Sequence, residues 1–188
     1  MSFKVSNRKR ATAVGILIVL AYSMLVYSIT GNKILGFFTD VISGLAVIGI
    51  PLLLYPFFNT NGNRRLNYAY LLSRLGEGAL MIVGGLFILI PSVTLYRDSI
   101  YENIHIYFFI AGALALYLLL YRTRLVPAYI SVWGLIATLI LLLVTVIRLF
   151  GVNSSLFDVL LLPIILNELY LAFWLIIKGF DPEATGKS

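Results

Sequence analysis

The sequence predicts an all-α integral membrane protein, a bundle of about six transmembrane helices with both termini in the cytoplasm. Three observations support this fold class. Hydrophobic residues make up 61% of the 188-residue chain and charged residues only 12%, whereas soluble domains typically carry about 45–50% and about 25%. The apolar residues are gathered in stretches long enough to cross a bilayer. Finally, most Lys and Arg residues fall on one side of those stretches, as the positive-inside rule requires.

Each crossing helix needs about 20 mostly apolar residues to span about 30 Å of hydrocarbon. The connections between the apolar stretches are short, so consecutive helices should be antiparallel neighbours within a single transmembrane domain, residues 1–188. The third stretch is long enough to tilt or to extend past the membrane. The predicted spans cover residues 11–29, 34–58, 66–96, 103–121, 127–150 and 156–177.

Proline and glycine punctuate these spans. Kinks are common in membrane helices, which favours bends at the prolines over carbonyl groups freed to line a cavity. Gly76 and Gly78 flank Glu77, and small residues of this kind are typical of packing faces, although they could also leave room for a ligand. The prolines inside the predicted spans are Pro51, Pro56, Pro91 and Pro163.

The distribution of positive charge predicts the orientation. With the N-terminus inside, ten Lys and Arg residues fall on the cytoplasmic side and three on the outer side, which favours cytoplasmic termini. The inner set is Lys4, Arg8, Lys9, Arg10, Arg64, Arg65, Arg122, Arg124, Lys178 and Lys187, and the outer set is Lys33, Arg97 and Arg148.

Four polar side chains lie deep inside two of the spans. Arg74 and Glu77 are three residues apart in the third span and so share a helix face, and Asn167 and Glu168 lie in the sixth. At 1.5 Å per residue, Arg74 lies roughly 13 Å inward from Arg65, and Glu168 lies at a similar depth. Each charge alone would cost about 2.5–3.5 kcal/mol at that depth. We therefore expect the third and sixth helices to touch, with Arg74 between the two glutamates.

One guanidinium and two carboxylates leave a surplus negative charge. Either one glutamate keeps its proton, or a cation or a hydrogen-bond donor such as Asn167 compensates the second negative charge. Arg74, Glu77, Asn167 and Glu168 are therefore candidate residues for binding a ligand or a proton, because ionisable groups at this depth mark solute and proton pathways. The alternative is a purely structural role, in which the cluster only holds two helices together and fixes their register.

A second candidate group lies toward the outer side. Glu102 and His105 show the i, i+3 relation found in carboxylate-bridged metal sites, but such sites normally need two of these pairs with further glutamates. Interfacial side chains reaching for water explain the group more simply, so no metal site is predicted. An intramembrane enzyme acting on a lipid remains an alternative that would use these residues. The group comprises Asp40, Glu102, His105, Arg148 and Asp158.

The sequence lacks the residues that several classes of function require. The chain has no cysteine and one histidine, which excludes thiolate chemistry and multi-histidine metal centres within one chain. Common nucleophile, zinc and phosphate-binding motifs are missing, so the sequence leans away from an enzyme and predicts no cofactor. The net charge of +6 follows membrane topology and forms no stripe for nucleic acid. The expected partners are the lipid bilayer and a small-molecule or lipid ligand, and a protein partner is left open.

Two stretches carry a family resemblance. Leu-Leu-Tyr-Arg-Thr-Arg-Leu-Val-Pro-Ala-Tyr-Ile-Ser-Val-Trp-Gly-Leu-Ile at 119–136 and Leu-Pro-Ile-Ile-Leu-Asn-Glu-Leu-Tyr-Leu-Ala-Phe-Trp-Leu-Ile-Ile-Lys-Gly-Phe at 162–180 resemble domain-of-unknown-function family 4386. Leu-Tyr-Pro at 54–56 and the motif Arg74-x-x-Glu77-Gly78 agree more weakly, and His105 resembles a histidine often found before the Arg-Leu-Val run.

The resemblance implies a small prokaryotic protein of the cytoplasmic membrane. It implies no established activity, substrate or cofactor. Its motifs include the residues already chosen on physical grounds, and they add Trp133 and Lys178. The leading hypothesis is therefore a non-enzymatic protein that binds or moves a small solute, a lipid-like molecule or a proton, and a structural or accessory subunit is the remaining alternative.

Overall fold

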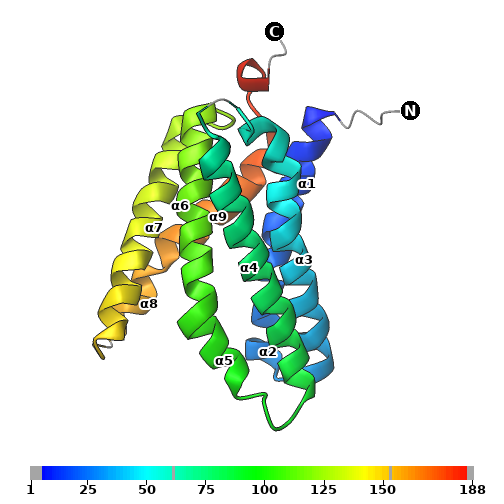
Figure 1. Cartoon of the computed structure of the whole chain (residues 1–188), viewed down its shortest axis with the longest axis vertical. Helices are drawn as coiled ribbons and strands as arrows, with labels where there is room; N and C mark the ends of the chain where they lie inside the picture. The colour runs from blue at the N-terminus through cyan, green and yellow to red at the C-terminus, as the bar shows by residue number, and fades with distance from the viewer. Residues whose placement is uncertain (1–5, 61, 153, 186–188) are drawn as a thin grey trace.

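The structure is a computed structural model that describes residues 6–60, 62–152 and 154–185, and within these ranges it contains helices and no strand (Figure 1). Six helical segments are long and apolar enough to cross a membrane, which confirms the all-α multi-pass class. The first three spans are α1 (Asn7–Ala21) with a 3-10 turn (Tyr22–Met24) and α2 (Leu25–Thr30), α3 (Lys33–Phe58), and α4 (Arg64–Leu89). The last three are α5 (Tyr96–Ile100) with a π-helical turn (Tyr101–His105) and α6 (Ile106–Thr123), α7 (Ala128–Leu149), and α8 (Leu156–Leu160) with α9 (Leu162–Ile177).

The outer surface of the bundle is apolar along the spans. Large side chains such as Leu45, Leu72 and Leu143 are 59–66% exposed, which would be unfavourable in water. In hydrocarbon these side chains are solvated, and the helix satisfies its own backbone N–H and C=O groups, so helices are the stable local structure there. The membrane environment therefore explains both the helix content and the apolar exterior.

The boundary between the third and fourth spans differs from the prediction. The third span was expected to reach Tyr96, but α4 ends at Leu89 and Tyr96 begins α5. Ile90 has extended dihedral angles (φ −105°, ψ 104°) because a residue that precedes a proline is driven out of the helical region. Pro91 therefore ends a helix, Pro163 lies in the first turn of α9, and only the two prolines of α3 lie inside a continuous helix.

Short, well-capped turns connect the spans. Gly31 ends α2 with φ of 64°, and the Asn32 side chain accepts a hydrogen bond of 3.0 Å from the Leu35 backbone N–H at the start of α3. Arg124 ends α6 with φ of 56°, and Pro127 directly precedes α7. Such short connections force consecutive spans to run antiparallel, as expected.

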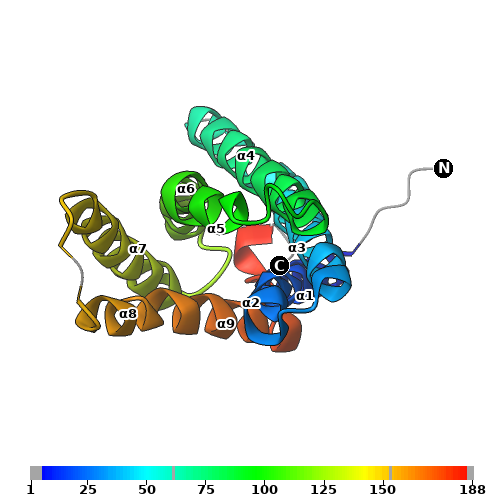
Figure 2. The same cartoon turned by 90° about the horizontal axis from the view of Figure 1, so that it is seen from below.

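The six spans are arranged as a ring in chain order. Each long helix packs against the helices before and after it, and α1 closes the ring by packing against α9 (Figure 2). As a result, α4 and α9 lie on opposite sides of the ring (Figure 2). The ring encloses a central space that every span can reach with its inward-facing side chains.

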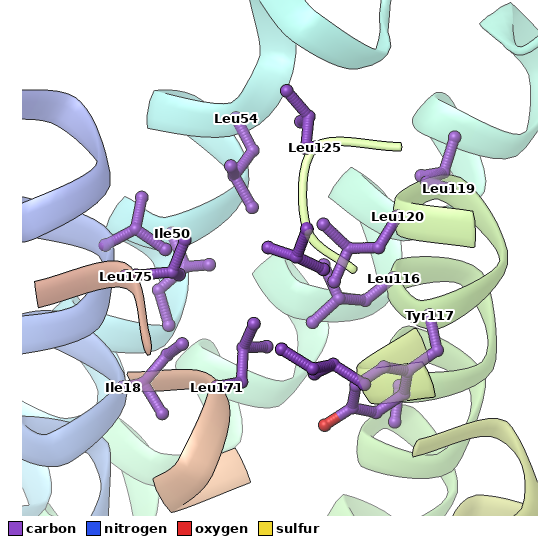
Figure 3. Close-up of a cluster of buried hydrophobic side chains, with 14 of the residues drawn as sticks. Ile18, Ile50, Leu54, Leu116, Tyr117, Leu119, Leu120, Leu125, Leu171 and Leu175 are labelled. Carbon is purple, nitrogen blue, oxygen red and sulfur yellow. The ribbon is translucent and has the colours of Figure 1, made fainter. Parts of the chain in front are cut away.

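An apolar plug fills the ring in the half nearer the termini. It is built from leucine and isoleucine side chains of α1, α3, α6 and α9, with Leu125 from the turn after α6 (Figure 3). These side chains are almost fully buried. The main members of the plug are Ile18, Ile50, Leu54, Leu116, Leu119, Leu120, Leu125, Leu171 and Leu175.

The chain ends reinforce this closed side. Both ends of the described chain lie at the same end of the bundle (Figure 1). Arg8 donates hydrogen bonds of 2.8 Å to the carbonyl groups of Ile176 and Ile177 at the end of α9, and the Phe180 ring packs in a tilted arrangement against Phe57. The cytoplasmic orientation of this end stays a prediction, and two of the charges behind it, Lys4 and Lys187, lie outside the described residues.

Candidate functional site

A cavity of about 770 Å³ occupies the other half of the ring, and its lining comes from all six spans. The plug forms its floor through Ile18, Ile50, Leu116 and Leu171. From there it extends to the end of the bundle opposite the termini, where Glu102 lies at its mouth. Small-molecule pockets typically measure about 300–1,000 Å³, so the cavity is large enough for a ligand.

The charged cluster predicted from the sequence lies in the wall of this cavity. Arg74 Nη1 donates a hydrogen bond of 2.8 Å to Glu77 Oε2, and Arg74 Nη2 lies 4.0 Å from Glu168 Oε1. Arg74 is 4% exposed and Glu77 is 2% exposed. The guanidinium therefore lies between two carboxylates from opposite sides of the ring, as expected.

The third and sixth spans touch, as expected, through Arg74 and Glu168. They are not the main packing partners of each other, because α4 packs mostly on α3 and α6 while α9 packs mostly on α1 and α7. Arg74 reaches Glu168 across the cavity. The long arginine side chain can span this distance. The ion pair therefore forms part of the cavity wall and does not lie between two closely packed helices.

Neighbouring residues hold the guanidinium in place. A methyl group on Gly112 would lie 2.9 Å from Arg74 Nε, so only glycine at this position of α6 leaves room for the side chain. The rings of Phe109 and Tyr70 lie with their centroids 5.4 and 5.8 Å from the guanidinium carbon. Cations are stabilised over aromatic faces at such distances, which helps to offset the burial of Arg74.

The sixth-span glutamate has a second partner that the sequence did not suggest. Tyr22 donates a hydrogen bond of 2.7 Å from its hydroxyl group to Glu168 Oε2. Tyr22 begins the 3-10 turn that interrupts the first span, and short 3-10 stretches within a helix often mark functional positions. Ser23, next to it, binds Ser43 of α3 at 2.8 Å, which anchors the turn to the ring.

His105 belongs to the inner cluster and not to the outer group in which the sequence placed it. Its Nε2 atom lies 3.8 Å from Glu77 Oε1, and its ring stacks on Tyr101 with centroids 4.9 Å apart. The π-helical turn explains the difference, because its wider winding changes which residues share a face. His105 is consequently buried whereas Glu102 is exposed, so the expectation that His105 is an interfacial side chain reaching for water was wrong.

Asn167 does not join the charged cluster. It is fully buried, and its Nδ2 group donates a hydrogen bond of 3.0 Å to the Ile130 carbonyl of α7. It therefore connects α9 to α7 on a face adjacent to that of Glu168, because consecutive helix residues point in directions about 100° apart. Of the alternatives for the surplus negative charge, a hydrogen bond from Asn167 to a glutamate is therefore not the one that the structure shows.

Asp40 also lies in a different environment from the one predicted. The sequence placed it among interfacial side chains that reach for water, but it is fully buried. Arg97 binds both of its oxygens, at 2.8 and 3.0 Å, and the Tyr101 hydroxyl donates a third hydrogen bond of 3.1 Å. Arg97, predicted to be an outer loop charge, is itself only 3% exposed and forms a buried ion pair.

The remaining outer candidates surround the mouth of the cavity. Arg148 and Asp158 form an ion pair of 2.8 Å, with side-chain exposures of 39% and 74%. Glu102 lines the mouth and makes no ion pair within the described ranges. Across residues 6–60, 62–152 and 154–185, no three His, Asp or Glu side chains gather as a metal site would require. The structure thus separates the five outer candidates into three different environments.

The glycines beside Glu77 serve packing. A methyl group on Gly78 would lie 2.6 Å from the Gly44 carbonyl oxygen, and one on Gly76 would lie 2.4 Å from the Phe108 ring. These glycines allow α3 and α4 to approach closely and seat a neighbouring side chain. They do not provide space for a ligand, which the cavity on the inner side supplies.

Two tyrosines and Arg97 are the residues that sequence reasoning missed. Tyr22 lies inside the apolar first span, and Tyr101 lies within the fourth span as the structure defines it. A tyrosine hydroxyl in an apolar span needs a polar partner, and this signal was available in the sequence.

Comparison with known proteins gives one match. A family model described as Domain of unknown function (DUF4386) matches residues 92–179. This range covers the last three spans with His105, Asn167 and Glu168, together with all or nearly all of the two longer motifs that suggested the family. Arg74, Glu77 and the Leu-Tyr-Pro motif lie outside it. No curated protein and no solved structure matches the chain significantly. Over these C-terminal spans, the chain is therefore similar to the DUF4386 family, whose function is unknown.

Proposed function

We propose that this multi-pass membrane protein binds a small amphipathic molecule in the central cavity, with the polar end of that molecule at the Arg74, Glu77 and Glu168 cluster. One observation carries the proposal. A single cavity of about 770 Å³ has this buried charged cluster on its wall and apolar side chains over most of its remaining surface. Ligand sites typically combine a mostly apolar lining with a few converging polar groups.

The shape of the cavity favours binding from one side of the bundle. The plug closes the terminal side, while the mouth lies at the opposite end. Movement of the ligand across the bilayer would additionally require Leu54, Leu120 and Leu175 of the plug to separate. We therefore propose binding as the basic function, in a prokaryotic cytoplasmic membrane with both chain ends inside, and transport as a function that depends on opening the plug.

The other hypotheses find less support. An enzyme built on His105 with Glu102 or Asp158 would need these side chains together, whereas His105 contacts Glu77 and Asp158 is paired with Arg148. A purely structural cluster would explain the ion pairs, but it gives no reason for a cavity beside them, because protein interiors are normally close-packed.

A cavity-filling variant tests the proposal. Ile164 lines the cavity and is 3% exposed, while Leu166, two residues further along α9, is 54% exposed toward lipid. The protein would be purified in native lipid discs, and the molecules released by organic extraction would be identified by mass spectrometry. We expect wild type and Leu166→Trp to carry a common small amphiphile at near-stoichiometric amount, and Ile164→Trp to lose it. Identical extracts from all three proteins would overturn the proposal.

A further inference from the structure

The hydrogen-bonding state of the cluster indicates what kind of polar head the cavity accepts. Arg74 Nη1 is bound to Glu77, Nη2 faces Glu168, and Nε lies buried against the space that Gly112 leaves. Within the described ranges, Nη1 makes the only hydrogen bond of this guanidinium, and Nε is buried without a partner. Each of the two carboxylates also retains one oxygen that makes no hydrogen bond within the described ranges.

Two carboxylate oxygens remain open at the cavity wall. Glu77 uses Oε2 for Arg74 and leaves Oε1, and Glu168 uses Oε2 for Tyr22 and leaves Oε1. His105 Nε2 lies 3.8 Å from Glu77 Oε1 and is buried without a hydrogen-bond partner within the described ranges. All three residues line the same cavity.

The charged groups that line the cavity also favour a cationic ligand. Its lining contains the guanidinium groups of Arg74 and Arg148 and the carboxyl groups of Glu77, Glu102, Asp158 and Glu168. Arg148 is paired with Asp158, and Arg74 is one cation between two carboxylates. One carboxylate in the interior and Glu102 at the mouth are left without a matching positive charge. A cation entering the mouth would meet an attractive field along the whole path.

From these observations we propose that the ligand is a cationic amphiphile whose head is a primary ammonium group. This inference rests on the proposed function and specifies its ligand class. An ammonium group has three N–H donors and no acceptor, which suits the open carboxylate oxygens of Glu77 and Glu168. Its positive charge balances the second glutamate, and its apolar chain lies against the apolar wall formed by residues such as Val47, Met81 and Leu141.

Four probes with the same twelve-carbon chain test this assignment. Dodecylammonium, dodecyltrimethylammonium, dodecanol and dodecanoate would be titrated calorimetrically, below their aggregation concentrations, into the full chain in phosphatidylcholine nanodiscs, with empty nanodiscs as the blank. We expect dodecylammonium to bind one per chain and about tenfold or more tighter than dodecanol, because hydrogen bonds to charged groups have roughly that effect. Dodecyltrimethylammonium, which lacks N–H donors, should bind more weakly than dodecylammonium.

Variants then locate the head group. Glu168→Gln removes one carboxylate but keeps an oxygen that can accept from Tyr22, so folding should be preserved even if Glu77→Gln is unstable. We expect Glu168→Gln to weaken dodecylammonium binding about tenfold and to leave dodecanol binding unchanged. Glu183→Gln is the matched control, because Glu183 is exposed in the short helix after α9, and it should change neither.

Each other outcome has a distinct meaning. Equal affinity for dodecylammonium and dodecanol, or tighter binding of dodecanoate, would overturn the cationic head while the amphiphile cavity stands. Equal affinity for the two ammonium probes would overturn the requirement for N–H donors. If none of the four probes binds at one per chain, the proposed function itself fails, and this inference fails with it.

Discussion

Two aspartate–arginine pairs in this protein have the same length and opposite environments. Asp40–Arg97 and Arg148–Asp158 each include an N–O distance of 2.8 Å, but the first pair has side-chain exposures of 0% and 3% and the second of 74% and 39% for Asp and Arg respectively. Removing one partner of a buried pair costs about 3–5 kcal/mol, because a charge is left buried and unpaired. Removing one partner of an exposed pair costs about 0–1 kcal/mol. After Asp40→Ala, Arg97 keeps one carboxylate partner, Asp98, at 3.0 Å, whose side chain is 70% exposed. We therefore expect Asp40→Ala to lower the free energy of unfolding by up to about 3–5 kcal/mol, and Asp158→Ala by at most about 1 kcal/mol.

The measurement is reversible unfolding of the purified protein in mixed micelles, followed by circular dichroism as sodium dodecyl sulfate is added. A further variant distinguishes the cost of a buried charge that has lost its partner from the cost of lost packing. Asp40→Leu combined with Arg97→Met leaves no buried charge and should recover most of the stability lost in Asp40→Ala. Equal costs for Asp40→Ala and Asp158→Ala, or a double variant less stable than Asp40→Ala, would refute the argument that burial determines the cost.

Three further predictions concern the cavity and the topology. Tyr22→Phe removes a hydrogen bond to the Glu168 carboxylate and should lower the free energy of unfolding by about 1.5–3 kcal/mol in the same assay. Gly112→Ala places a methyl group 2.9 Å from Arg74 Nε, so it should cost about 1–3 kcal/mol through overpacking and weaken dodecylammonium binding severalfold. For the topology, a membrane-impermeant maleimide should label Ser154→Cys in intact cells and Thr60→Cys only after permeabilisation, since the natural chain has no cysteine.

Each of these three predictions has an outcome that would contradict it, and the glycine variant also has a matched control. Gly49→Ala is the control for Gly112→Ala, because its methyl group would meet only the flexible end of Leu17, at 3.0 Å. Similar costs for the two glycine variants would show that Arg74 is not held in place by its neighbour. Unchanged stability in Tyr22→Phe would mean that Glu168 does not depend on this hydroxyl group. Labelling of Thr60→Cys in intact cells would reverse the predicted orientation.

The fold class could be predicted because lipid imposes one simple rule on the backbone. Any segment inside hydrocarbon must satisfy its own hydrogen bonds, so about 20 consecutive apolar residues become a helix whatever their neighbours are. The one large error in the boundaries, between the third and fourth spans, has a different cause. The apolar run continued past Pro91, but the proline ended α4 for a local steric reason that hydropathy does not register.

The candidate site was predicted only in part. Arg74, Glu77 and Glu168 could be grouped because a charge in hydrocarbon needs a partner, and the depth of each along its helix follows from the residue count. The rotation of each helix about its axis does not follow from the count. This is why Asn167 was assigned to the wrong face and His105, turned inward by the π-helical turn, to the wrong group.

By itself, the sequence determined that this chain forms six antiparallel membrane helices and that a few charges must meet inside them, since both results depend only on the cost of polar groups in lipid. Only the tertiary structure decided that the helices close into a ring in chain order, plugged with leucine at one end and hollow at the other. Ring closure depends on the packing of side chains between specific helix faces, with close fits such as Gly112 against Arg74 and Gly134 against Tyr117. These fits involve residues far apart in the chain, and no local pattern records them.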